Sequence, residues 1–312
     1  MSAILDIIAP VFALVLVGYA VARTPVWTPG ATASFSKFVY YVALPTLLFG
    51  KLASGRAFDG VDPLIAAAYF GGCLATMALT VAFSRCVFRI SGEEHALIGM
   101  AGGFSNTVLL GLPLIVLTFG DAAVGPITAI IAFNAMILIP VTTLLIELSR
   151  GRAADRRLRA ILFAPIPPLF RNPILIGIVA GAAWSFTGIG LASPVERYLD
   201  LLSAAAGPCA LFALGASLAE YRIAGRLPET AAMTGFKLVV HPLIVWLLCT
   251  QVFGLDALTT GVATMMAAVP VGATVFVIAH QHDSFVGPVS SAILISTGLS
   301  AATLAVVIGL LG

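Results

Sequence analysis

Apolar segments long enough to cross a lipid bilayer recur along the whole chain. A transmembrane helix needs roughly 20 mostly apolar residues, and ten segments of the 312-residue sequence meet this requirement. Hydrophobic residues make up 60% of the chain and charged residues 10%, whereas soluble domains carry about 25% charged residues. The chain lacks the polar surface of a water-soluble protein. We therefore expect an all-α, multi-pass membrane protein.

The predicted spans divide the chain into two halves. The five spans of the first half, residues 1–147, are 4–22, 31–52, 63–88, 95–119 and 123–147. The five spans of the second half, residues 172–312, are 172–190, 195–219, 229–253, 256–280 and 285–311. Residues 148–171 between the halves hold six arginines and three prolines, which predicts a basic cytoplasmic linker. No basic segment precedes the first span, so we interpret it as a retained helix rather than a signal peptide.

The two halves share landmarks at a nearly constant offset, which indicates an internal duplication. One constant shift superposes Pro10 on Pro173, Gly18 on Gly181, Pro45 on Pro208, Leu48 on Leu211 and Phe49 on Phe212. With a single deletion, the same shift places the Asp-Ala-Ala-Val-Gly-Pro motif of 121–126 on the Asp-Ser-Phe-Val-Gly-Pro motif of 283–288. One such match could arise by chance in a chain rich in Gly and Ala, but matches across three separated spans favour a repeat.

An odd number of spans per half means that the second half enters the membrane in the opposite sense. Inverted repeats of this kind are typical of secondary transporters. Basic residues favour the cytoplasmic side of short loops. With the N-terminus outside, the cytoplasmic set is Arg23, Arg85, Arg89, Arg150, Arg152, Arg156, Arg157, Arg159, Arg171, Arg222 and Arg226. The external set is Lys51, Arg56 and Arg197. Eleven basic residues against three predict that both termini are periplasmic.

The fourth span of each half is interrupted near its middle by helix-breaking residues. The fourth span contains Gly-Gly-Phe-Ser-Asn-Thr over 102–107, and the ninth contains Val-Pro-Val-Gly-Ala-Thr over 269–274. The shift that relates the two halves places Asn106 on Val269, directly before the proline. Broken helices expose backbone N–H groups that bind anions, although two kinked packing helices are the alternative. The candidate binding residues are Ser105, Asn106, Thr107, Pro113, Asn134, Val269, Pro270, Gly272 and Thr274.

Two lysines lie within predicted spans, where an ionisable group is costly and often functional. Lys37 lies in the second span, and Lys237 lies in the eighth with His241 one helical turn later. We take these three residues as candidates for coupling or for attracting an anion. The alternatives are that each lysine reaches the membrane interface with its long stem and that His241 packs in the interior. Acidic residues are absent deep within the spans, which favours a proton or the membrane potential over sodium as the driving force.

The remaining composition excludes several other functions. The four cysteines lie in or beside apolar segments without a CxxC spacing, so we predict neither a metal site nor a disulfide framework. The net charge of +2 comes from basic residues spread between the spans, which gives no patch for nucleic acid. We expect no catalytic residues and no cofactor, and the sequence leaves a homodimer open.

Three motifs resemble those of bacterial members of the auxin efflux carrier family. They are Ser-Lys-Phe-Val-Tyr-Tyr-Val-Ala-Leu-Pro over 36–45, Asn-Thr-Val-Leu-Leu-Gly-Leu-Pro-Leu over 106–114, and Pro270 followed by Phe-Val-Ile-Ala-His-Gln over 276–281. This family includes malonate-type transporters and is related to plant PIN-type auxin carriers and, more distantly, to bile acid/sodium symporters. The resemblance covers the full length of the chain.

The resemblance implies that the spans form two domains with different functions. Spans 1, 2, 6 and 7 would form a scaffold domain, and spans 3–5 and 8–10 a transport domain whose broken fourth and ninth helices cross beside the substrate. It also implies elevator-type alternating access and small carboxylate substrates. Family members often carry an Asn shortly after the ninth-span proline, and the nearest match in this chain is Thr274.

Together these features predict a secondary active transporter of mono- or dicarboxylates, auxin-like or malonate-like, in the bacterial inner membrane. One alternative is a transporter-derived membrane sensor that signals through the basic linker. A second is an intramembrane acyl or prenyl transferase, which would need a polar catalytic cluster that the sequence does not contain. Membrane lipid and a small organic carboxylate are the expected partners.

Overall fold

The computed structural model describes residues 2–54, 62–150 and 171–311. The helices of the first half are α1 (Ser2–Ala22), α2 (Ala31–Phe38), α3 (Leu44–Ala53), α4 (Leu64–Val87), α5 (Gly92–Gly103), α6 (Leu112–Phe119) and α7 (Val124–Ser149). The helices of the second half are α10 (Pro173–Phe186), α11 (Ser193–Leu218), α12 (Leu227–Gly235), α13 (His241–Leu247), α14 (Ala257–Ala268), α15 (Thr274–Gln281) and α16 (Val286–Leu311). These ranges contain no β-strand, which confirms the all-α class. Most of the predicted basic linker lies outside them.

Single turns of π-helix extend several of these helices. They are Val39–Ala43 between α2 and α3, Thr107–Gly111 before α6, Phe236–Val240 between α12 and α13, and Leu248–Val252 after α13. Helical segments therefore occupy each of the ten ranges expected from the sequence. By length and composition, six stretches of the described residues are suited to cross a membrane: Leu5–Ala22, Leu64–Val87, Thr107–Ser149, Ser193–Leu218, Leu227–Val252 and Val286–Leu311. The ten-span inverted layout stays a prediction.

Short polar side chains fix where the two interrupted helices begin. Ser91 and Glu94 form a capping box at the start of α5, in which each side chain accepts the backbone N–H of the other residue, at 3.2 Å and 2.7 Å. Asp256 caps α14 by accepting from the N–H of Thr259 at 3.0 Å. Each cap satisfies donors that an apolar environment would otherwise leave unpaired. The sequence thus specifies both helix starts locally.

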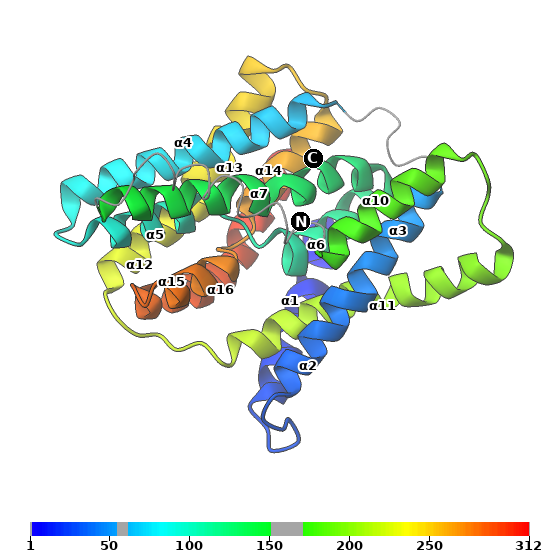
Figure 1. The fold of residues 1–312 in the computed structure, drawn as a ribbon, viewed down its shortest axis with the longest axis horizontal. Helices are drawn as coiled ribbons and strands as arrows, with labels where there is room; N and C mark the ends of the chain where they lie inside the picture. Colours follow the sequence, from blue (N-terminus) through cyan, green and yellow to red (C-terminus); the bar gives the residue numbers. More distant parts are fainter. Residues whose placement is uncertain (1, 55–61, 151–170, 312) are drawn as a thin grey trace.

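The helices pack into two bundles (Figure 1). In the small bundle, α1 packs along α11, and α3 packs along α10 and α11, with α2 at its end. In the large bundle, α4 packs against α5, α7 and α13. Helix α14 packs against α13 and α16, and α16 also packs against α12. Helix α6 contacts α1 and α11 on one side and α14 on the other. The centre of the molecule, where the interrupted helices lie, is therefore where the two bundles meet.

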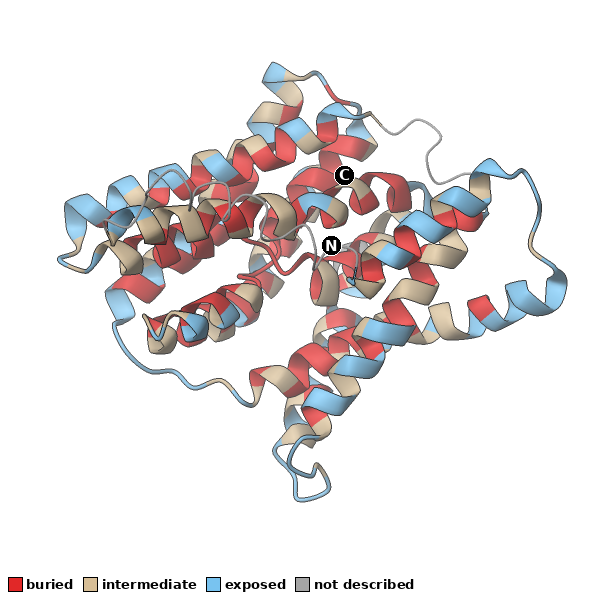
Figure 2. Ribbon diagram, viewed as in Figure 1, coloured by how far each residue is buried: buried red, intermediate tan, exposed pale blue. Residues whose placement is uncertain are grey.

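Glycines allow the closest helix contacts of the small bundle. A Cβ added to Gly18 of α1 would collide with the carbonyl oxygen of Phe212, and one added to Gly181 of α10 would lie 2.7 Å from that of Phe49. Small residues at such positions let apolar helices approach closely without a hydrophobic driving force from water. Figure 2 shows that the buried faces of the helices point inward and the outer faces are exposed. Large apolar side chains such as Leu201 and Leu310 lie on that outer surface, as expected for contact with lipid.

Candidate functional site

The interruptions of the two broken helices meet and pair in an antiparallel sense. Ser105 lies opposite Val271 in an isolated bridge. The N–H of Asn106 donates to the carbonyl of Pro270, and the N–H of Gly272 donates to the carbonyl of Phe104, both at 2.9 Å. These two bonds hold together chain segments that belong to opposite halves of the sequence. We call this element the crossing.

The residues at the crossing explain why both helices stop there. Pro270 has no N–H to continue α14, and its ring excludes a regular helical path. Gly272 is required by the close approach of the chains, because an added Cβ would lie 2.8 Å from the carbonyl oxygen of Ser105. The chain then resumes helical structure at Thr107 on one side and at Thr274 on the other. In the first turns after the breaks, the N–H of Thr107 donates to the carbonyl of Ser105 at 2.9 Å, and the N–H of Val275 donates to that of Gly272 at 3.1 Å.

Asn106 combines a structural bond with an unused donor. Its side-chain oxygen Oδ1 accepts from the N–H of Leu109 at 3.3 Å and so caps the turn that follows. Among the described residues, no hydrogen-bond partner reaches the buried Nδ2 of Asn106, the Oγ of Ser105 or the Oδ1 of Asn134. Buried polar atoms are nearly always satisfied by protein, water or a ligand. Three such atoms beside one break therefore indicate a place where a polar ligand or water binds.

A cavity of about 400 Å³ lies against the crossing. Of the residues selected from the sequence, its lining includes Ser105, Asn106, Thr107, Asn134, Gly272, Thr274 and Lys37. The Nδ2 of Asn134 also donates to the Oγ1 of Thr107 at 3.4 Å, which links α7 to the break. The structure thus brings together candidates from four separate segments, and Lys37 supplies a positive charge to the same cavity.

The other candidates lie outside this lining. Val269 and Pro270 belong to the crossing, where Pro270 contributes its backbone carbonyl. Pro113 lies at the start of α6 and faces α11, because a Cβ added to Gly207 of α11 would lie 3.7 Å from the Cβ of Pro113. Lys237 and His241 are both fully buried and contact each other on the stretch that joins α12 to α13. Lys237 therefore does not reach the membrane interface.

Several lining residues were missed by the sequence analysis. The cavity wall includes Ser36, Tyr40 and Tyr41, none of which is among the candidates from the sequence. Asn172 also lines the cavity, and its side chain caps α10 by accepting from the N–H of Ile174 at 3.0 Å. An Asn-Pro pair at a helix start was the available signal for Asn172. Within the described ranges, no three His, Cys, Asp or Glu side chains gather closely enough to hold a metal ion.

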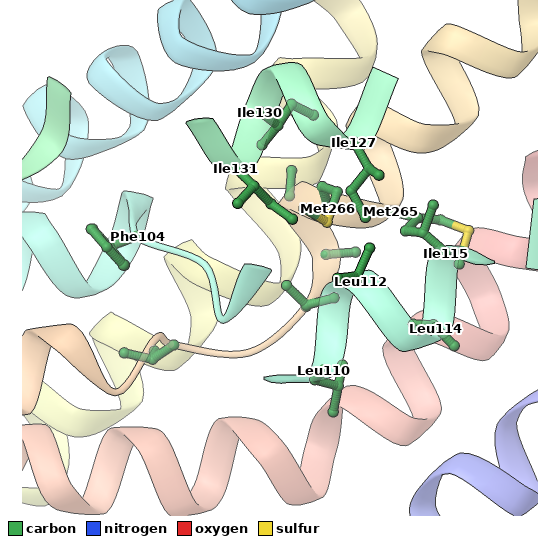
Figure 3. Close-up of a cluster of buried hydrophobic side chains, with 14 of the residues drawn as sticks. Phe104, Leu110, Leu112, Leu114, Ile115, Ile127, Ile130, Ile131, Met265 and Met266 are labelled. Carbon is green, nitrogen blue, oxygen red and sulfur yellow. The ribbon is translucent and has the colours of Figure 1, made fainter. Parts of the chain in front are cut away.

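A cluster of buried apolar side chains packs around the break that follows α5 (Figure 3). Leu112 and Ile115 of α6 pack with Ile127 of α7 and with Met265 and Met266 of α14, and all five are fully buried. Gly111 permits this contact, because an added Cβ would lie 2.7 Å from the sulfur of Met266. The apolar cluster and the polar cavity are adjacent, because Phe104 and Ile131 belong to the cluster and also line the cavity.

An ion-pair cluster joins the ends of three large-bundle helices away from the cavity. Arg150 at the end of α7 donates to both carboxylate oxygens of Glu93 at the start of α5, at 2.5 and 2.6 Å. Arg226, before α12, lies 3.4 Å from Glu94. The hydrogen bonds to Glu93 raise the pKa of Arg150 above its ordinary value, so the pair stays charged. These contacts fasten α5, α7 and α12 to one another.

Comparison with known proteins gives one family across nearly the entire chain. The family model described as "Membrane transport protein" (Mem_trans) matches residues 3–308. A protein of Rhizobium meliloti named "Putative malonate transporter" is 30% identical over 308 residues, which cover 97% of this chain and 94% of that protein. An "Uncharacterized transporter" of Methanothermobacter thermautotrophicus is 26% identical over 96% of this chain and 95% of its own length. The Escherichia coli "Uncharacterized transporter YfdV" is 25% identical over 75% of this chain and 74% of its own.

Proposed function

Because the chain belongs to the Mem_trans family of membrane transport proteins, we propose that it is a secondary active transporter of small organic anions that bind at the crossing. Family membership confirms the resemblance to auxin efflux carriers seen in the sequence. The family and the relatives are transporters and not enzymes. Together with the apolar helices, this makes the chain a multi-pass membrane protein. The name of the Rhizobium relative makes malonate the first substrate to test.

The cavity at the crossing is the observation that carries the proposal. An anion in a low-dielectric site loses most of its hydration, so its oxygens need protein donors. The amide Nδ2 of Asn106 is buried there without a partner in the described chain, and the hydroxyl of Ser105 lies beside that of Tyr69 without a hydrogen bond of good geometry. Lys37 adds a basic side chain to the same lining. This donor set suits a mono- or dicarboxylate.

Elevator-type exchange is supported by where the cavity lies. Its lining takes Lys37, Tyr40 and Asn172 from the small bundle and Asn106, Asn134 and Thr274 from the large bundle. We propose that the small bundle, spans 1, 2, 6 and 7, is the scaffold and that spans 3–5 and 8–10 are the moving transport domain. A substrate held mainly by the crossing would then travel with the large bundle. The ion pairs at the ends of α5, α7 and α12 would help that bundle move as a unit.

The inverted-repeat proposal gains support from reciprocal contacts. Gly18 of α1 approaches the backbone of Phe212, and Gly181 of α10 approaches the backbone of Phe49. The constant shift between the halves relates Gly18 to Gly181 and Phe49 to Phe212, so the two contacts are equivalent under the repeat. Such exchange between halves is what a two-fold pseudosymmetric assembly requires.

We further propose a bacterial inner-membrane location with both termini periplasmic, from the distribution of basic loops. In that orientation Ser36, Lys37 and Asn172 lie toward the cytoplasmic ends of their helices. The cavity reaches these residues, which supports an inward-facing arrangement. The absence of acidic residues deep in the predicted spans favours a proton or the membrane potential over sodium as the driving force. A homodimer stays a prediction.

Counterflow in proteoliposomes tests this function directly. Vesicles containing the purified protein and preloaded with unlabelled malonate should transiently accumulate labelled malonate from outside. Protein-free vesicles treated in the same way are the control. A panel of other mono- and dicarboxylates added as competitors would define the substrate class. If no carboxylate in the panel supports counterflow or competes, the proposed function is wrong.

A further inference from the structure

Lys237 is a fully buried lysine in the large bundle, outside the lining of the cavity. Its side chain has no exposed surface. Its Nζ donates to the backbone carbonyl of Ala267 and lies 3.1 Å from the Nδ1 of His241. Among the described residues, no ion pair includes Lys237. Burial of the charged form of a lysine without an opposite charge is costly, so a charged Lys237 needs an anion to balance it.

The carbonyl that Lys237 contacts is at the carboxyl end of a half-helix. Helix α14 ends at Ala268, immediately before the crossing, so the carbonyls of its last turn lack the partners that a continuous helix would supply. This end of a helix carries partial negative charge, which attracts a cation. Lys237 thus occupies the position where a half-helix would otherwise attract a free monovalent cation.

Uncharged groups surround the other sides of Lys237. The Nε2 of His241 lies 3.3 Å from the sulfur of Cys73, which leaves Nδ1 to accept from the lysine when Nε2 carries the proton. The hydroxyl of Tyr69 lies beside both Cys73 and Ser105 without a hydrogen bond of good geometry to either. These buried polar side chains therefore extend from Lys237, which contacts the end of α14, to the break that follows α5.

We infer that Lys237 is a tethered counter-cation, which takes the place of a co-bound metal cation and lets the crossing bind an anion without added sodium. This inference rests on the proposed function, because the opposite charge that balances Lys237 is the transported carboxylate. The positive charge belongs to the large bundle and moves with it. A monocarboxylate-loaded bundle would carry no net charge at the site, and the empty bundle would carry one positive charge.

Chemical rescue separates a charge at this place from simple packing. Lys237→Ala removes the ammonium and leaves a space beside the Ala267 carbonyl and His241. Lys237→Met removes the charge but retains most of the volume. We expect both variants to bind malonate several-fold more weakly, because the long-range attraction between the ammonium and the bound carboxylate is lost. Propylammonium, a free analogue of the lost side chain, should restore binding to Lys237→Ala but not to Lys237→Met, where the space is filled.

The measurement is malonate affinity of purified protein by calorimetry, in chloride salts of sodium, lithium, potassium and N-methylglucamine at equal ionic strength. Wild-type affinity should be the same in all four salts. A sodium requirement in the wild type would overturn the inference, as would wild-type affinity in Lys237→Met. These outcomes leave the proposed function standing. If instead the wild type binds no carboxylate in any salt, the proposed function itself fails. Should Lys237→Ala not fold, the wild-type salt series and Lys237→Met still decide.

Discussion

The two breaks at the crossing have the same backbone role but opposite chemistry. The break after α5 is polar, with Ser105, Asn106 and Thr107, and two of its buried side-chain atoms have no partner in the described structure. The break after α14 is apolar up to Gly272. Side chains of other helices satisfy backbone groups of this break. The N–H of Val271 donates to the Oγ of Ser296 at 3.1 Å, and Lys237 donates to the carbonyl of Ala267.

This difference assigns separate roles to the two breaks of the site. The polar break has spare donors, so it is suited to recognise the ligand. Neighbouring helices contact the backbone of the apolar break, so this break is suited to fix the geometry of the crossing and the position of Lys237. Substitutions in the first break should therefore lower affinity and leave the fold intact. Substitutions in the second should lower stability and affinity together.

The largest effect on affinity is expected for Asn106→Ala. Loss of a hydrogen bond to a charged ligand costs about 1.5–3 kcal/mol, which corresponds to about 10- to 150-fold weaker malonate binding by calorimetry. Asn106 also caps the turn after the break, so Asn106→Ser is the matched control, since serine keeps a capping oxygen. Asn106→Ser should fold like the wild type and bind better than Asn106→Ala. Wild-type affinity in Asn106→Ala would remove Asn106 from the site.

Gly272→Ala should affect stability and binding together. The added Cβ would lie 2.7 Å from the ring of Phe104 and 2.8 Å from the backbone oxygen of Ser105. The backbone oxygen cannot rotate away, so the pairing of the crossing must shift, at a cost of about 1–3 kcal/mol. A lower melting temperature in detergent, with weaker malonate binding, is the expected result. Gly298→Ala in α16 is the control, because an added Cβ there has no atom within 4 Å. Equal melting temperatures for the two variants would contradict this role of Gly272.

Much of the fold was accessible from the sequence because apolar length and helix breakers are local properties. Helices occupy every expected range, and the interruptions fall at Gly103 and Pro270 as the composition of those segments indicates. The sequence did not predict which residues pair at the crossing. The bridge pairs Ser105 with Val271, whereas the shift given by the landmarks of the other spans would place Ser105 on Ala268. That shift also places Asn106 on Val269, but the reciprocal hydrogen bonds relate Asn106 to Gly272.

The candidate site could be predicted in part, because a polar residue in an apolar span is also a local property of the sequence. Polar residues in apolar spans pointed to Asn106, Asn134 and Lys37, and all three line one cavity. A single sequence does not show which face of an apolar helix meets protein and which meets lipid, since both are apolar. Tyr40 was therefore not among the candidates, and the sequence left open whether Lys237 reaches the membrane interface or lies in the interior. Only the packing of α4 and α14 around Lys237 decides between them.

The smallest effect is expected for Thr274→Ala, which tests the comparison from the apolar side. Thr274 lines the cavity in the first turn of α15. Its hydroxyl can offer a ligand one neutral hydrogen bond, worth about 0.5–1.5 kcal/mol, so malonate binding should weaken by about 2- to 10-fold. Thr274→Ser keeps the hydroxyl and should bind like the wild type. Because the recognition donors belong to the other break, Thr274→Ala should bind more tightly than Asn106→Ala in the same calorimetric series. The reverse order would mean that the break after α14 recognises the anion and that the assignment of the two roles is inverted.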